Sequence, residues 1–209
     1  MHRNERKKRD DEMTTETRLE ADSIGTTEVP AEAYYGVQAL RAKQNFPITG
    51  TKLHPVFIKN LAQVKKAAAI TNNNAGLLPK DKADAIIRAC DEVIAGKWAE
   101  EFIVDAIQGG AGTSANMNMN EVIANRAGEL LGCPKGSYKM VHPNDHVNMA
   151  QSTNDVIPTA GKLTVLDLLA PLEKALGRLE RELAKKAEEL YFALVESSEL
   201  SQKKGKFSK

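Results

Sequence analysis

The feature that most constrains the fold of this chain is an apolar stripe in its C-terminal third. Large apolar side chains recur there at alternating spacings of four and three, with Lys186 as the one break. We call this stripe the leucine seam; its members are Val165, Leu169, Leu172, Leu176, Leu179, Leu183 and Leu190. Such a heptad pattern is typical of a long helix that packs on other long helices. One helix cannot bury the seam by itself, so partner helices must come from elsewhere in the protein or from other subunits.

Two features bound this predicted helix. Pro171 lies inside the seam, and because an interior proline costs about 3 kcal/mol, we expect a kink there or the start of the helix. After the seam the chain becomes polar. Residues 193–209 are therefore predicted to form a divergent polar tail without regular structure.

The middle of the chain also has helical periodicity. One apolar stripe starts near His54 and stops at residues 74–76, and a second follows Pro79 and stops at Gly96. A third runs from Met119 to Gly132. Residues 14–50 are broken by glycine and proline and are expected to be irregular. Because alternating β-branched runs are scarce, the predicted fold class is mainly α.

Composition excludes several classes of protein. The 209 residues carry 29 Lys and Arg against 28 Asp and Glu, a net charge of +1, which argues against a nucleic-acid-binding protein. No apolar run reaches the roughly 18 residues that a membrane span needs. Residues 1–13 form a charged polar tail without the apolar stretch of a secretory signal, so we expect a cytoplasmic protein. Cys90 and Cys133 are expected to be small apolar residues in a reduced compartment.

The first polar segment that suggests chemistry is QGGAGTSANMN at residues 108–118. Glycines allow close approach of a ligand to backbone N–H groups, and Thr113 and Ser114 add neutral hydroxyl donors. Next to the start of a helix these donors suit a carboxylate or a developing oxyanion. The structural alternative is a glycine-rich turn in which Ser114 is the helix N-cap. The segment lacks the Lys-Ser/Thr ending of a phosphate-binding loop, and no strand precedes it as in a dinucleotide site.

The second such segment is QSTND at residues 151–155. Ser152, Thr153 and Asn154 place two hydroxyls and an amide at the entry of the long helix, although Asp155 alone would be enough as a cap. Just upstream, HPNDH contains His142, Asn144, Asp145 and His146. Histidine beside carboxylate suggests a metal site or a proton relay, but this spacing matches no standard ligand pattern, so no metal ligand is assigned.

These segments resemble the aspartase/fumarase superfamily. The matching stretches are residues 29–46, 64–69, 107–127 and 142–160, and the likeness runs from about residue 18 to about residue 189. Within the superfamily, AYYGVQALRA, GGAGTS and QSTN are more similar to the aspartases than to the fumarases.

The resemblance implies the reversible elimination of ammonia from L-aspartate to give fumarate, through a carbanion stabilised by a carboxylate. By resemblance, Thr113, Ser152, Thr153 and Asn154 bind the substrate carboxylates. His142, Asn144 and Asp145 match a second anion site of fumarases. No cofactor is implied, because hydroxyl and amide donors stabilise the charge.

The resemblance also implies an architecture. Residues 14–150 match the N-terminal lyase domain, and residues 151–192 match the first helix of a central helical bundle. Members of the superfamily are homotetramers whose active sites are built from three subunits, which accounts for the unpaired leucine seam.

The sequence departs from the superfamily in several respects. Members are much longer, the Gly-Arg-Thr/Cys-His segment expected soon after the first long helix is absent, and from about Leu190 the chain leaves the family pattern. The catalytic serine lies in a GSS-x-MP-x-K-x-N loop that is not found here, and Ser197 and Ser198 do not match it. No catalytic residue is therefore assigned, and the chain alone is expected to be an inactive portion of a lyase. The alternatives are a fumarase-type hydratase, or a non-catalytic helical fragment that self-associates.

Overall fold

The computed structural model describes residues 16–206, with side chains to residue 197. The expected tail at residues 1–13 lies outside this range. The elements run in the order β1 (Thr17–Asp22), β2 (Gly25–Pro30), α1 (Val37–Asn45), α2 (Pro55–Asn74), α3 (Lys80–Ile94), η1 (Ala99–Glu101), α4 (Thr113–Leu130), η2 (Pro143–Val147) and α5 (Thr153–Lys206). The predicted mainly α fold class is confirmed. The chain divides into two compact units at Thr164/Val165, and each is described by itself.

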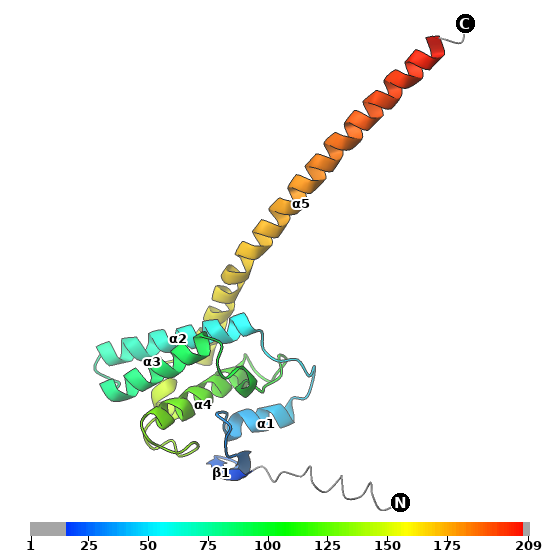
Figure 1. Ribbon diagram of the computed structural model, residues 1–209. Helices are drawn as coiled ribbons and strands as arrows, with labels where there is room; N and C mark the ends of the chain where they lie inside the picture. Colours follow the sequence, from blue (N-terminus) through cyan, green and yellow to red (C-terminus); the bar gives the residue numbers. More distant parts are fainter. Residues whose placement is uncertain (1–15, 207–209) are drawn as a thin grey trace, which may run out of the picture. The chain divides into compact units, whose positions relative to one another are not determined.

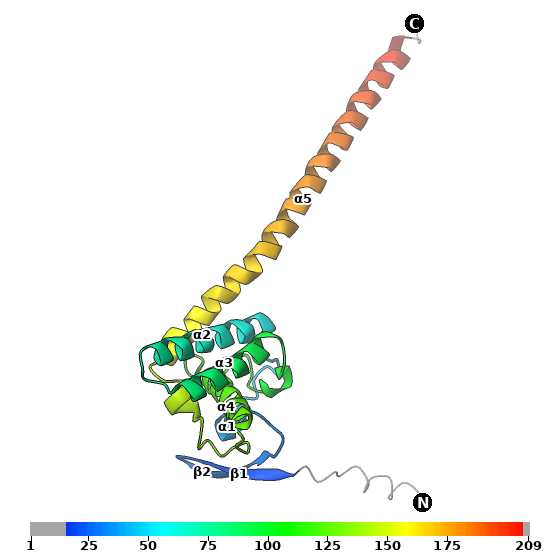
Figure 2. The ribbon, with the colours of Figure 1, turned by 60° about the vertical axis from the view of Figure 1, so that its left-hand side comes forward.

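The first unit begins with an antiparallel hairpin of β1 and β2, which pairs Thr17 with Pro30 and Asp22 with Gly25. The expectation that residues 14–50 are irregular was wrong, because this stretch forms the hairpin and α1 (Figure 2). The apolar and polar alternation typical of a strand is not visible in this sequence, because the inward side chains of β1 are charged. Arg18 donates to the backbone carbonyls of residues 30, 31, 33 and 35, and Glu20, 3% exposed, accepts from the N–H of Val37.

Helices α2 and α3 confirm the predicted boundaries. His54 is the N-cap of α2, its Nδ1 accepting from the N–H of Val56 at 3.2 Å, and Gly76 in a left-handed conformation follows the end of the helix. Pro79 is the N-cap of α3, and Gly96, also left-handed, follows its end. The two helices lie side by side in both ribbon views (Figures 1 and 2).

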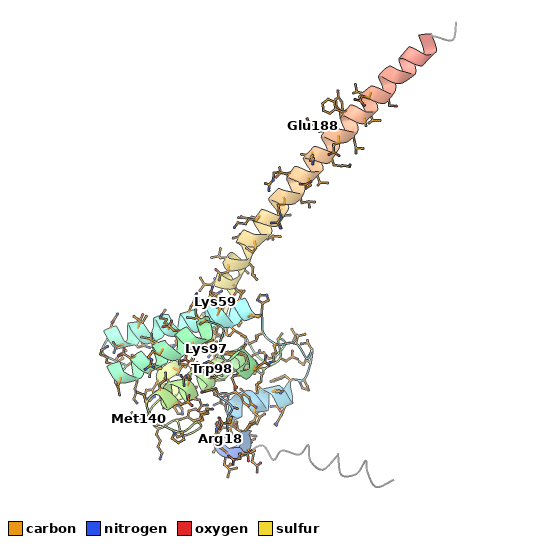
Figure 3. All side chains as sticks on the ribbon, in the orientation of Figure 1. Arg18, Lys59, Lys97, Trp98, Met140 and Glu188 are labelled. Carbon is orange, nitrogen blue, oxygen red and sulfur yellow. The ribbon has the colours of Figure 1, made fainter. Side chains whose placement is uncertain are left out.

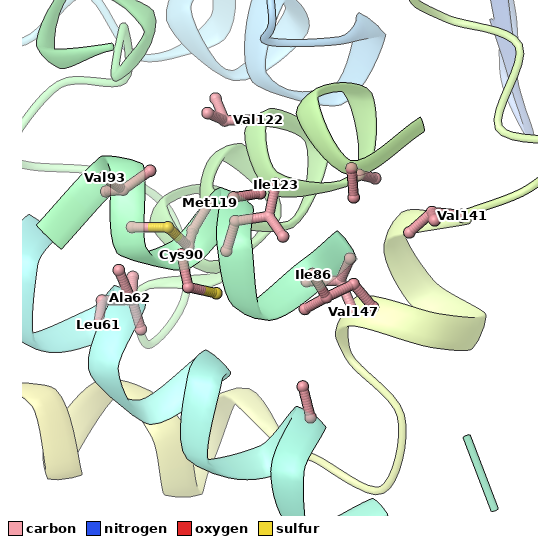
Figure 4. Close-up of a cluster of buried hydrophobic side chains, with 14 of the residues drawn as sticks. Leu61, Ala62, Ile86, Cys90, Val93, Met119, Val122, Ile123, Val141 and Val147 are labelled. Carbon is pink, nitrogen blue, oxygen red and sulfur yellow. The ribbon is translucent and has the colours of Figure 1, made fainter. Parts of the chain in front are cut away.

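The main core lies between α2, α3 and α4 (Figure 4). Its fully buried members include Leu61 from α2, Ile86 and Cys90 from α3, and Met119 and Ile123 from α4. The prediction of a small buried apolar role holds for Cys90, which is 0% exposed. Cys133 is only half-buried.

Helix α4 begins at Thr113, six residues before the predicted start at Met119. The apolar periodicity did not predict the true start, because the first turns of α4 are rich in polar residues. Gly112, with φ 89°, is the N-cap, so the alternative that gave this role to Ser114 was wrong. A Cβ at Gly112 would lie 2.9 Å from the side chain of Ile157, so a larger residue would collide with α5.

Three buried polar side chains of α4 bind backbone groups of the surrounding loops and of the start of α1. Asn118 accepts from the N–H of Ile103 and donates to the carbonyl of residue 101. Glu121 accepts three N–H bonds from residues 36, 38 and 39 at 2.9–3.0 Å, and so caps the start of α1. Asn125 accepts from the N–H of Gly136 at 2.7 Å and donates to the carbonyl of residue 34 at 2.8 Å. Hydrogen bonds as well as apolar burial therefore hold α4 in place.

The second unit is the part of α5 from Val165 onward. The helix passes through Pro171 without interruption and continues to Lys206. The alternative that placed the helix start at Pro171 was therefore wrong, as was the expectation that residues 193–206 lack regular structure. Nine of the fourteen residues from 193 to 206 are Ala, Leu, Glu, Gln or Lys, which are good helix formers and favour the helical state. The leucine seam is exposed in the chain by itself, with Leu176 at 55% and Leu183 at 61%. Figure 3 draws the side chains of this helix as sticks, with Glu188 labelled. No helix within residues 16–206 has both the length and the apolar content to cross a membrane.

Candidate functional site

The start of α4 is held by the loop before it. The side-chain oxygen of Gln108 accepts from the N–H of Ala115 at 2.6 Å, and its amide nitrogen donates to the carbonyl of Asp105 at 3.0 Å. The N–H groups of Thr113 and Ser114 have no partner among the described residues, as is usual for the first turn of a helix. The Thr113 side chain is exposed. The helix start therefore offers backbone and hydroxyl donors to a ligand.

The start of α5 has a different arrangement. The Ser152 carbonyl accepts from the N–H groups of Asp155 and Val156, and its Oγ accepts from the N–H of Asn154 at 3.2 Å. Ser152 is thus the cap, and the alternative that gave this role to Asp155 was wrong. The Ser152 hydroxyl keeps its own proton to donate, and the Asn154 side chain is exposed.

The structure brings the two helix starts together through Asn116. Its amide nitrogen donates to Thr153 Oγ1 at 3.1 Å and to Asn148 Oδ1 at 3.2 Å. Asn116 lies one turn after Thr113 on α4, so this hydrogen bond joins the first turns of α4 to the first residue of α5. Sequence reasoning missed Asn116 as a site residue, because an amide in a helix gives no signal of its partners.

Sequence reasoning also missed Lys65, which lies under this site. Lys65 is on α2 and is 0% exposed, and its Nζ donates to Asn148 Oδ1 at 2.8 Å and to Gln151 Oε1 at 3.0 Å. Burial lowers the pKa of the Lys65 ammonium to about 7. The only available signal was the pair Lys65–Lys66 within an apolar, alanine-rich helix, where one of two adjacent lysines is forced inward.

The residues of the predicted second anion site lie elsewhere in the first unit. His142 caps η2, its Nδ1 accepting from the N–H groups of Asn144 and Asp145 at 3.3 Å. His142 and Asn144 line a cavity of about 290 Å³ that also contains carboxylates of Asp22 and Glu121. Anion binding at this place stays a prediction. Among residues 16–206, no three His, Cys, Asp or Glu side chains are grouped to hold a metal ion.

Comparison with known proteins adds to this geometry. Residues 25–194 match the profile of a protein family described as lyase. The chain is 56% identical over 177 residues to the aspartate ammonia-lyase of Bacillus sp., and 53% identical over 174 residues to that of Helicobacter pylori strain J99. It is 49% identical over 180 residues to the aspartate ammonia-lyase of Escherichia coli K12. These alignments cover 85%, 82% and 85% of this chain but 38%, 37% and 38% of the relatives. The chain thus spans less than two fifths of the length of these curated relatives.

Solved structures agree with the sequence relatives. A fumarate lyase:delta crystallin from Brucella melitensis matches with a TM-score of 0.77 and 52% identity, covering 78% of this chain and 39% of that one. A class II fumarase from Schistosoma mansoni matches with a TM-score of 0.69 and 41% identity, covering 72% of this chain and 32% of that one. The predicted resemblance is therefore confirmed in both sequence and fold.

Proposed function

The chain belongs to this lyase family, within the aspartase/fumarase superfamily, and on that premise we propose that it provides substrate-binding residues of an aspartate ammonia-lyase. The reaction is the reversible removal of ammonia from L-aspartate to give fumarate. The observation that carries the proposal is the Asn116–Thr153 hydrogen bond, which unites two donor-rich helix starts.

The chemistry of this reaction explains the choice of residues. Removal of the proton next to the β-carboxylate turns that group into a doubly charged enediolate, so negative charge accumulates on two oxygens. Preorganised donors that meet such oxygens lower the barrier strongly. In the proposal, Thr113, Ser152, Thr153 and Asn154 provide these donors, and no cofactor is needed.

The base that removes the proton is proposed to lie outside the residues described above. No described histidine or carboxylate is hydrogen-bonded to the hydroxyls of Thr113, Ser152 or Thr153. A neutral hydroxyl at the start of a helix is a poor base without such a neighbour. We propose that a segment matching the remaining length of the relatives, or another subunit, supplies it.

Assembly is part of the proposal. The exposed leucine seam supports packing on helices of other subunits, and we propose a homotetramer acting in the cytoplasm. A patch of this kind exposed to solvent favours self-association.

A chimera tests the function. The aligned stretch of the Bacillus sp. relative is replaced by the corresponding 177 residues of this chain, and formation of fumarate from L-aspartate is followed by ultraviolet absorbance. We expect turnover in the chimera, and a loss of about 10- to 100-fold in kcat/KM on Thr153→Val, which removes one hydrogen bond to a charged group. Thr159→Val, an exposed threonine on the same helix, is the matched control and should retain activity.

Other outcomes would favour the alternatives. The likeness to the Schistosoma mansoni fumarase makes a hydratase the second candidate, and a chimera that hydrates fumarate but releases no ammonia would support it. The 209-residue chain by itself should release no ammonia. Turnover by the isolated chain would contradict the proposal that another segment provides the base.

A further inference from the structure

The hydrogen bonds around Lys65 have a fixed direction. Lys65 Nζ donates to Asn148 Oδ1 at 2.8 Å, so the oxygen of the Asn148 amide is turned toward Lys65. On its other side Asn148 Nδ2 donates to the carbonyl of Gln151 at 3.3 Å, and a carbonyl can only accept. The side-chain amide of Asn148 is therefore held in one orientation from both ends.

The orientation of Asn148 determines that of Asn116. Because Asn148 Oδ1 is an acceptor, Asn116 must present its Nδ2 to it at 3.2 Å, and the same nitrogen reaches Thr153 Oγ1. The Asn116 Oδ1 is left buried without a partner among the described residues. Turning the amide over would bring Oδ1 toward the Thr153 hydroxyl, but would also set two acceptor oxygens against each other at Asn148. The buried, unpaired Oδ1 of Asn116 is unfavourable, but the opposite orientation of the amide would lose the hydrogen bond to Asn148.

The Thr153 hydroxyl accepts this hydrogen bond from Asn116. A hydroxyl has one proton, and because Oγ1 accepts from Asn116, that proton is not used within the network. No described residue accepts it, and the Thr153 side chain is half-buried at the start of α5. We propose that Asn116 is a positioning residue: it forces Thr153 Oγ1 to accept on its inner side, so that the hydroxyl proton points outward to a substrate carboxylate. This inference rests on the proposed function for the identity of the ligand.

The inference explains why an amide is found at position 116. An aspartate there would accept the Thr153 proton and turn the hydroxyl away from the ligand. An alanine would leave the hydroxyl free to rotate. Only a side chain that donates to both Asn148 and Thr153 maintains the outward proton.

Neutron diffraction of the deuterium-exchanged 209-residue chain tests the direction without reference to activity. We expect deuterons on Asn116 Nδ2 toward both Asn148 and Thr153, and the Thr153 deuteron away from Asn116. A Thr153 deuteron lying between its Oγ1 and Asn116 would overturn the inference.

The role of this direction is tested in the Bacillus chimera. Asn116→Asp should lower kcat/KM for L-aspartate by about 10- to 100-fold near neutral pH, because one donor to a charged group is lost. The loss should shrink as the pH falls, since a protonated carboxyl donates again to Thr153. Asn116→Ala should show a loss that acid does not relieve.

A matched control separates positioning from folding. Asn73 is a half-buried asparagine in the last turn of α2 whose Nδ2 donates to the carbonyl of Leu78, and Asn73→Asp should show no gain of relative activity in acid. A pH-independent loss in Asn116→Asp, or an acid-dependent gain in Asn73→Asp, would refute the positioning role. An unmodified chimera without turnover would count against the proposed function instead, and the neutron result would still decide the direction of the hydrogen bond.

Discussion

Lys65 provides a sharp test of the energetics of the first unit. Burial lowers the pKa of its ammonium from 10.5 to about 7, so above pH 7 the unfolded chain binds more protons at this residue than the folded chain. Stability therefore rises with pH, at a limiting slope of about 1.4 kcal/mol per pH unit. Between pH 7 and about pH 8.5 the expected gain in the free energy of unfolding is roughly 1.5 kcal/mol.

The upper limit of this window is set by Cys90, which faces Lys65. Burial raises the pKa of the Cys90 thiol to about 12, so its ionisation in the unfolded chain opposes the gain at higher pH. The carboxyl of Glu121, whose pKa burial raises to about 7, is still partly protonated at the lower end of the window and slightly reduces the gain there. Below pH 7 the imidazole of His146, whose pKa burial lowers, also contributes.

The assay is urea unfolding followed by the fluorescence of Trp98, the one tryptophan of the chain. Its ring contacts Tyr34 at 4.4 Å between centroids and its Nε1 donates to Glu92, so it reports on the first unit. Lys65→Met retains the apolar stem and removes the titrating group, and its stability should change little over the same pH window. An equal slope in both proteins, or no slope in the parent chain, would refute the reasoning.

Three further predictions concern packing and assembly. Gly36→Ala should lower the free energy of unfolding by about 3 kcal/mol, because the new Cβ would lie 2.7 Å from the carboxylates of Glu20 and Glu121. Gly161→Ala lies in open space within α5 and should raise the free energy of unfolding by up to about 1 kcal/mol. Urea titration measures both changes. Glu121→Gln should cost about 2 kcal/mol, since an amide retains one acceptor oxygen for three N–H donors, and an unchanged thermal midpoint would contradict this. Glutamate at both Leu176 and Leu183 should lower the sedimentation coefficient of any self-associated species, and an unchanged value would show that the leucine seam is not the contact.

The parts of the fold that the sequence predicted are those with an apolar stripe and a clear end signal. Helices α2 and α3 are bounded by Pro55, Gly76, Pro79 and Gly96, whose conformational preferences are local. The hairpin was missed because its inward residues are Arg18 and Glu20 rather than apolar residues. Their burial depends on partners far along the chain, which no local pattern contains.

The candidate site was predicted in pieces. The donor-rich segments at residues 108–118 and 151–155 were recognised from their composition, and the structure places both at helix starts. Their connection through Asn116, and the buried Lys65 beneath it, could not be predicted. Both depend on contacts between residues separated by 37 to 86 positions in the sequence.

The hydrogen-bonded side chains of α4 have one more consequence. A helix held only by methyl and methylene groups can slide or rotate slightly at small cost, because such contacts have no direction. Asn118, Glu121 and Asn125 instead meet fixed N–H and C=O groups in loops and at the start of α1, and a shift by a single residue would break every one of these bonds. These distant backbone segments therefore help to fix the position of Thr113 along the helix axis. Substitutions that disturb them should displace Thr113 before they unfold the core.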